Sequence, residues 1–166
     1  MITYYIVAFI AGFLVKITDW IDDDRGGKDI IKYPFAIIYG IGIGYLISTA
    51  PFATIFIAAL FAQIFARKID THTHMLGFFI AMISVLFMGF PQIEILYFVI
   101  FLILAFLDEI EFVGRLKWIS DHRPFLKLGA LPFILIGKWE FFAGIVTFDL
   151  GYHFFDWIQH SYIRKK

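Results

Sequence analysis

Apolar residues gather in long runs that are separated by short polar or charged connections, and this pattern dominates the chain. The runs cover residues 2–17, 33–47, 51–66, 75–90, 93–107, 125–137 and 139–158. A helix needs about 20 apolar residues to cross a bilayer, and shorter runs span it when their polar ends snorkel or the bilayer thins. We therefore predict an all-α, polytopic transmembrane helical bundle of about seven spans, built as a single membrane domain over residues 1–166.

Two of the runs carry features that bear on how they would sit in a membrane. The first has no basic region before it and no small-residue cleavage site, so we predict a retained span rather than a signal peptide. The sixth, residues 125–137, contains Lys127 and Pro132. Proline removes a helical hydrogen bond, and an interrupted helix is tolerated in a bilayer only where protein surrounds it. The sequence leaves open whether this run spans or is re-entrant.

Basic residues concentrate at alternate connections and so indicate an orientation. Thirteen of the 14 Lys and Arg residues lie in or beside the first, third and fifth connections or in the C-terminal tail, and Lys138 is the exception. Because cytoplasmic connections collect Lys and Arg, we predict an integral membrane protein with its N-terminus outside and its C-terminus cytoplasmic. The formal net charge of zero gives no reason to expect nucleic acid as a partner. The absence of cysteine excludes disulfides and thiolate chemistry.

Short motifs recur in the two halves of the chain. The first half has Asp19-x-x-Asp22, a basic connection, Pro34-Phe35 and then Asp70-x-x-x-His74. The second half has Asp108-x-x-Glu111, a basic connection, Pro124-Phe125 and then Asp149-x-x-x-His153. This order predicts a 3+1+3 parallel repeat with halves 1–74 and 93–160 and a linker span 75–92, a plan known in small transporters. Chance similarity is the alternative.

The repeated acids have spacings that suit a metal ion. Carboxylates at i and i+3, or a carboxylate and an imidazole at i and i+4, lie on one face of a helix. Oxygen ligands favour Mg²⁺ or Mn²⁺, and imidazole extends the choice to Zn²⁺. We therefore predict a divalent-metal cofactor, Mg²⁺ or Mn²⁺ before Zn²⁺, and the alternative is a solvated acidic cap at a helix end. The predicted ligands are Asp19, Asp22, Asp70, Asp108, Glu111 and Asp156.

The last run carries a stripe of polar residues among apolar ones. Asp149, His153, Asp156 and His160 follow one another at helical spacing, which places them on one face. A carboxylate inside a span is costly and is usually paired or functional. We predict His153 as a general base, because an imidazole beside carboxylates titrates near neutrality, and Asp149 and His74 as further catalytic residues. A structural ion pair is the alternative.

Basic residues flank these acids and suit a ligand that bears phosphate. Guanidinium groups bind phosphate oxygens in pairs, while a metal ion bridges them from the other side. We predict that Arg67, Arg115 and Arg123 hold phosphate. The alternative is that these cations follow the positive-inside rule and contact anionic headgroups.

Two sets of motifs resemble known membrane enzyme families. Asp19-x-x-Asp22-Asp23-Asp24-Arg25-Gly26-Gly27 with Pro34 and Gly40 resembles the second aspartate motif of UbiA-type intramembrane prenyltransferases. Arg123-Pro124, downstream of Asp108, resembles the first motif of that family. Arg115-Leu116-Lys117-Trp118-Ile119-Ser120, His122-Arg123 and Gly151-Tyr152-His153-x-x-Asp156 resemble the membrane-bound metal-dependent hydrolases. Both resemblances imply metal-assisted chemistry on a phosphate or diphosphate.

The sequence leaves three functions open. For each of them we expect membrane lipids to be partners of the protein. The first is a multi-pass membrane enzyme with a cytoplasm-facing divalent-metal site that acts on a phosphorylated lipid or prenyl diphosphate. The second is a cation- or proton-coupled small transporter whose two repeats rock around Asp149 and Asp70. The third is a non-catalytic membrane scaffold subunit. The outer ends of the runs offer almost no polar path, which favours the enzyme over the transporter.

Overall fold

The described part of the chain is helical throughout and contains no strand. The computed structural model describes residues 2–24, 30–114 and 117–163. Its helices are α1 (Ile2–Asp24), α2 (Lys32–Ile47), α3 (Ala50–Phe65), α4 (His72–Met88), α5 (Ile95–Asp108), α6 (Lys117–His122), α7 (Pro124–Ala130), the 3₁₀ helix η2 (Leu131–Ile136) and α8 (Trp139–Ile163). The prediction of an all-α protein is therefore confirmed, and every predicted apolar run lies largely within a helix.

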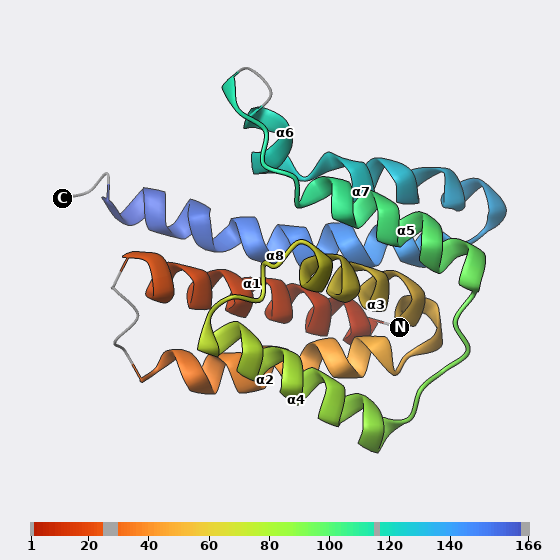
Figure 1. The fold of residues 1–166 in the computed structure, drawn as a ribbon, viewed down its shortest axis with the longest axis horizontal. Coiled ribbons are helices and arrows are strands. Elements are labelled where there is room, and N and C mark those ends of the chain that lie inside the picture. The colour runs from red at the N-terminus through yellow and green to blue at the C-terminus, as the bar shows by residue number, and fades with distance from the viewer. Residues whose placement is uncertain (1, 25–29, 115–116, 164–166) are drawn as a thin grey trace.

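The long helices lie alongside one another, and successive ones alternate in direction (Figure 1). The first and last helices form the most extensive contact, and α1 also packs against α2. Ring pairs between Tyr5 and Trp139 and between Trp20 and Phe155 show that α1 and α8 run parallel. Helix α2 packs against α4, α3 packs against α5, and α5 leads to α7 and η2. Residues from both ends of the sequence therefore meet at the centre of the bundle.

Glycines allow the closest of these helix contacts. A Cβ atom added at Gly12 would lie 2.0 Å from the carbonyl oxygen of Phe148, and one at Gly151 would lie 2.0 Å from that of Phe9. The backbones of α1 and α8 therefore touch where both residues lack a side chain. Small residues play this role in membrane helix pairs, where dispersion rather than the hydrophobic effect favours contact. Gly40 and Gly44 also bring α2 close to α4, where an added Cβ atom would lie 2.6 Å and 2.7 Å from a backbone carbonyl oxygen.

The sixth run is broken into two pieces, as its proline indicates. The α-helix α7 ends at Ala130, and the next turn of 3₁₀ helix has Pro132 near its start. Gly137 ends this turn with a left-handed backbone, at φ 78°. Because proline has no N–H group to donate, the α-helical pattern is interrupted there.

One described helix, residues 2–23, is long and apolar enough to cross a membrane by the measures of length and composition. Five further apolar segments are shorter, at 10–17 residues. Helix α8 has 25 residues and carries Asp149, His153 and Asp156 within it. The number of spans, the orientation and the repeat halves accordingly stay predictions.

Candidate functional site

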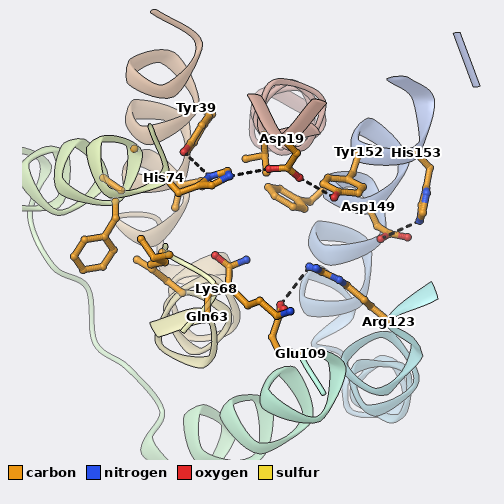
Figure 2. A pocket seen from close by; sticks show the side chains of 18 residues that line it. Asp19, Tyr39, Gln63, Lys68, His74, Glu109, Arg123, Asp149, Tyr152 and His153 are labelled. Atoms are coloured by element: carbon orange, nitrogen blue, oxygen red, sulfur yellow. Dashed lines mark hydrogen bonds and ion pairs between the residues drawn. The ribbon is translucent and has the colours of Figure 1, made fainter. Parts of the chain in front are cut away.

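A cavity of about 240 Å³ lies inside the bundle. Its walls come from α1, α2, α3, α4 and α8, and from the connections that follow α3, follow α5 and precede α7 (Figure 2). A water molecule occupies about 30 Å³ of liquid, so the cavity has room for several waters or a small polar group. Five residues predicted from the sequence line this one cavity: Asp19, His74, Arg123, Asp149 and His153.

A chain of polar side chains crosses the cavity from α2 to α8. Nε2 of His74 lies 2.8 Å from Oδ1 of Asp19. The hydroxyl of Tyr39 lies 3.2 Å from Nδ1 of His74, and the hydroxyl of Tyr152 donates to Oδ2 of Asp19 at 2.8 Å (Figure 2). Both oxygens of the carboxylate and both nitrogens of the imidazole therefore have partners. Four helices contribute one side chain each.

The start of helix α4 sets the position of His74. Thr71 caps this helix, and its hydroxyl accepts a hydrogen bond from the backbone N–H of His74 at 3.2 Å. Such a cap satisfies an N–H group that has no partner within the helix. The cap thus holds the first turn of α4 beside α1, where the imidazole reaches Asp19.

Arg123 and Glu109 form an ion pair on another wall of the cavity. Nη1 of Arg123 lies 3.2 Å from Oε1 of Glu109, whose side chain is only 6% exposed. Burial raises the pKa of Glu109, and the nearby guanidinium offsets part of this rise. Burial alone would lower the pKa of Arg123, but the Glu109 carboxylate and other negative groups raise it. The guanidinium is therefore charged at any physiological pH.

The backbone of Arg123, a residue of the cavity wall, is strained. Arg123 has φ 44° and ψ 61°, a left-handed conformation that is rare for a residue other than glycine. Strain of this kind persists only where surrounding contacts impose it. Asp108 supplies such contacts, because its two oxygens accept hydrogen bonds from the N–H groups of Phe125 and Leu126, each at 2.8 Å. The predicted metal ligand Asp108 is thus a cap for α7.

Two residues of the predicted stripe on α8, Asp149 and His153, line the cavity, and two lysines contact the acids of the stripe. Asp149 accepts a hydrogen bond from Lys127 at 2.8 Å, and Asp156 lies 3.4 Å from the ammonium of Lys16. His153 lies between these acids, 3.6 Å from Asp149 and 3.7 Å from Asp156. These two separations exceed an ordinary hydrogen bond. His74 is therefore the more firmly oriented of the two cavity histidines.

The remaining predicted metal ligands contact cations or face solvent. Asp22 pairs with Lys32 at 2.5 Å, Glu111 pairs with Lys68 at 2.5 Å, and Asp70 is exposed. Within residues 2–24, 30–114 and 117–163, no three His, Asp or Glu side chains form a group that could hold a metal ion. A resident metal consequently stays a prediction.

The three arginines predicted to hold phosphate have different surroundings. Arg123 lines the cavity, whereas Arg67 is exposed beyond the end of α3, in a left-handed conformation with φ 56°. Arg115 lies outside the described residues. Lys68, next to Arg67, does line the cavity and supplies a second cation there.

Sequence reasoning missed five polar residues of the cavity. Two of them, Lys68 and Glu109, directly follow the predicted residues Arg67 and Asp108 in the sequence. Tyr152 stands inside the Gly-Tyr-His motif of α8, and Gln63 is a lone amide in an apolar run. Tyr39 has no distinguishing neighbour, and only the packing of α2 on α4 brings it to His74.

The cavity thus combines an oriented imidazole–carboxylate pair with the cations Arg123 and Lys68. No protein-family model matches the chain, and no curated protein or solved structure has significant similarity to it. The geometry and chemistry of this cavity are therefore the basis for inferring a function.

Proposed function

We propose that the protein is a multi-pass membrane enzyme that acts on the phosphate or diphosphate of a lipid. The observation that carries this proposal is a single cavity with an acid–base pair, His74 and Asp19, and two cations, Arg123 and Lys68. An enzyme of this class needs the first pair to move a proton and the second to bind the phosphate.

The surface of the bundle supports the membrane part of the proposal. Large apolar side chains are exposed on most of the helices, including Phe79 at 60% and Leu135 at 89%. Soluble monomers rarely expose apolar surface so extensively, because each exposed methylene costs about 0.8 kcal/mol relative to burial. A bilayer removes this cost by solvating the side chains with hydrocarbon. Several short helices would span it by local thinning or tilt.

In the proposed mechanism His74 carries the proton. An imidazole titrates near neutrality, and the Asp19 carboxylate both orients the ring and stabilises its protonated form. The Tyr39 hydroxyl, beside Nδ1 of His74 and on the cavity wall, passes the proton between the ring and the reacting group. Arg123 and Lys68 stabilise the negative charge on the phosphate oxygens. His153 shares the cavity and is the second choice for the acid–base role.

In this proposal a metal ion would be held by fewer carboxylates than the six ligands predicted from the sequence. Mg²⁺ often binds through one or two carboxylates together with substrate phosphates rather than through a complete protein cage. Asp19 and Asp149, which both line the cavity, are the carboxylates that would take this part. The proton transfer and phosphate binding described above depend only on side chains of this chain.

The test uses the purified full-length protein in detergent micelles. We expect release of phosphate or pyrophosphate from phosphatidic acid or geranylgeranyl diphosphate, assayed with Mg²⁺, with Mn²⁺ and with a chelator. His74→Asn should lower the rate by about 10²–10⁴-fold, the usual contribution of a general acid or base. His160→Asn, the same change at an exposed position of α8, is the matched control and should leave the rate unchanged. Absence of turnover for both substrate classes, or equal rates for both variants, would contradict the proposal.

The chain Tyr39–His74–Asp19–Tyr152 also favours a second candidate, a proton-coupled transporter. Linked acids, imidazoles and hydroxyls inside a membrane bundle are typical of proton relays. Purified protein in liposomes, loaded with a pH-sensitive dye, would then change the lumenal pH when an outward substrate gradient is applied, with acidification for exchange against protons and alkalinisation for co-transport. His74→Asn should abolish that signal, whereas the enzyme proposal predicts no proton flux.

A further inference from the structure

Apolar side chains gather at one end of the cavity and polar side chains at the other. On α1, the lining residue Val15 precedes Asp19 by one helical turn. On α8, Phe148 precedes Tyr152 by the same interval. These two helices run parallel, so both apolar residues lie toward the same end of the bundle. Helix α3 has the direction of α1 (Figure 1), and there the apolar Leu60 also precedes the polar lining residue of that helix.

The order is reversed on α2 and α4, which run in the opposite direction to α1 (Figure 1). On α2 the polar Tyr39 comes one turn before the apolar Ile43. On α4 His74 comes one turn before Phe78 and two turns before Ala81. The five helices therefore place their apolar lining residues together, at the end of the cavity away from Asp19. This apolar floor consists of Val15, Ile43, Leu60, Phe78, Ala81 and Phe148.

Two lining residues depart from this division. Asp149 lies beside Phe148, but its carboxylate accepts a hydrogen bond from Lys127 at 2.8 Å. Ile69 follows Lys68 and so lies at the polar end. Neither residue adds an unpaired charge to the apolar floor. Within the described part of the chain, the floor therefore offers a ligand mainly hydrocarbon contacts.

An apolar floor favours hydrocarbon over water as its occupant. Empty cavities lined by apolar side chains stay dry, and one of about 150 Å³ binds benzene. The cavity here has a volume of about 240 Å³. It thus has room for about five or six carbons together with a phosphate group at the polar end.

We propose that the apolar floor binds the carbons next to the phosphate of the substrate, so that the site recognises an alkyl or prenyl phosphate rather than a glycerophospholipid. This inference rests on the proposed function, in which Arg123 and Lys68 bind the phosphate. Burial of each methylene group on the floor raises the affinity by about fourfold. Glycerol next to the phosphate would instead place oxygen atoms on the floor without hydrogen-bond partners, which costs free energy. Carbons beyond the floor lie outside the cavity and add little.

Soluble phosphate monoesters are suitable probes, because they share one head group and differ in the hydrocarbon. We expect calorimetric titration of the full-length protein in micelles, at one fixed pH, to show affinity that rises from methyl to propyl to pentyl phosphate. The rise should be about fourfold per methylene group, with little further gain for octyl phosphate. Glycerol 3-phosphate has the carbon skeleton of propyl phosphate with added hydroxyl groups. It should bind more weakly than propyl phosphate.

Substitutions that fill the apolar floor separate it from the phosphate site. Ala81→Leu adds three carbons at a fully buried position of α4, so its loss of affinity should grow with chain length, up to about 60-fold for pentyl phosphate. Val15→Ile narrows the floor from α1 by one carbon, should cost about fourfold for pentyl phosphate, and serves if Ala81→Leu fails to fold. Ala143→Leu, at a partly buried position of α8 outside the cavity lining, is the matched control and should leave every affinity unchanged.

Two further measurements keep the comparison clean. Longer phosphates partition into micelles equally for every variant, so ratios of affinity between variants report the floor alone. Arg123→Gln acts on the shared head group and should weaken all the phosphates by a similar factor. Unfolding temperatures identify any variant that fails to fold.

Failure of the apolar floor and failure of the phosphate site give different results. Equal affinities for methyl and pentyl phosphate, or losses in Ala81→Leu and Val15→Ile that do not depend on chain length, would overturn the floor and leave the phosphate site standing. Glycerol 3-phosphate that binds as tightly as propyl phosphate, or an equal loss in Ala143→Leu, would do the same. Absence of binding for every phosphate would overturn the phosphate site and the floor with it.

Discussion

Buried carboxylates in this bundle have a cationic side chain or backbone N–H groups beside them. Asp22 contacts Lys32, Asp149 contacts Lys127, and Asp108 accepts two backbone N–H groups. An ionised group in an apolar interior is tolerated only when such partners compensate its lost hydration. This pairing explains how an apolar chain carries acids inside its helices. Each of these acids thus has its own partner in the fold.

The Asp22–Lys32 pair should be the most important ion pair for stability. Both side chains are more than nine-tenths buried, and Oδ2 of Asp22 has no hydrogen-bond partner among the described residues. Lys32→Ala leaves an uncompensated charge, so it should lower the free energy of unfolding by about 3–5 kcal/mol. Lys138→Ala, which breaks a more exposed pair with Glu94, should cost about 0–1 kcal/mol. Chemical unfolding followed by circular dichroism measures both, and equal losses would contradict the argument.

Helix contacts, rather than single side chains, determine where the cavity lies. The close approach of α1 and α8 at Gly12 and Gly151 brings Asp19, about two turns beyond Gly12, to Tyr152, which follows Gly151 directly. The α2–α4 contact at Gly40 and Gly44 likewise carries Tyr39 to His74. Small residues at these helix crossings thus position the site residues without contacting a ligand themselves.

A methyl group at the α1–α8 crossing should disturb the fold. Gly12→Ala places its Cβ against the Phe148 backbone, which cannot rotate away, so we expect a loss of about 1–3 kcal/mol from overpacking. Gly42→Ala is the matched control, because its Cβ would meet only Val7 and Ala11 at 3.4 and 3.5 Å. The control should be neutral or stabilising, since alanine favours a helix by about 1 kcal/mol over glycine. Thermal unfolding of both variants tests this difference.

The pattern of apolar runs predicted the helices well, because each run is a local property of the chain. The break in the sixth run also followed from a local cause, Pro132. The partners of the site residues were not predictable in the same way. Nearly every face of α2 is apolar, so the sequence does not indicate which face of this helix turns toward another helix. Tyr39 therefore had no signal in the sequence, whereas Tyr152 lies in the Gly-Tyr-His motif of α8 and was not singled out there.

At the scale of the whole molecule, successive long helices alternate in direction (Figure 1), and the number and orientation of membrane spans stay predictions. The chain has no cysteine, so single cysteines can report the topology without background labelling. We expect a membrane-impermeant maleimide to label Gln92→Cys from outside intact cells and to leave Asp70→Cys unlabelled until the cells are opened. Both positions are exposed. The reverse pattern would contradict a site that faces the cytoplasm, and labelling of neither in opened cells would show that both are occluded.

The pairing of the first helix with the last has a consequence for how the protein is made. Asp19 and Tyr152 are separated by 133 residues, and ribosomes add roughly 5–20 residues per second. Roughly 7–27 seconds therefore pass between the synthesis of Asp19 in α1 and the synthesis of Tyr152 in α8. Throughout that interval the carboxylate of Asp19 lacks its hydroxyl partner and one wall of the cavity is missing. A nascent chain that lacks α8 therefore lacks Asp149, Tyr152 and His153, and the cavity is complete only once α8 has been made.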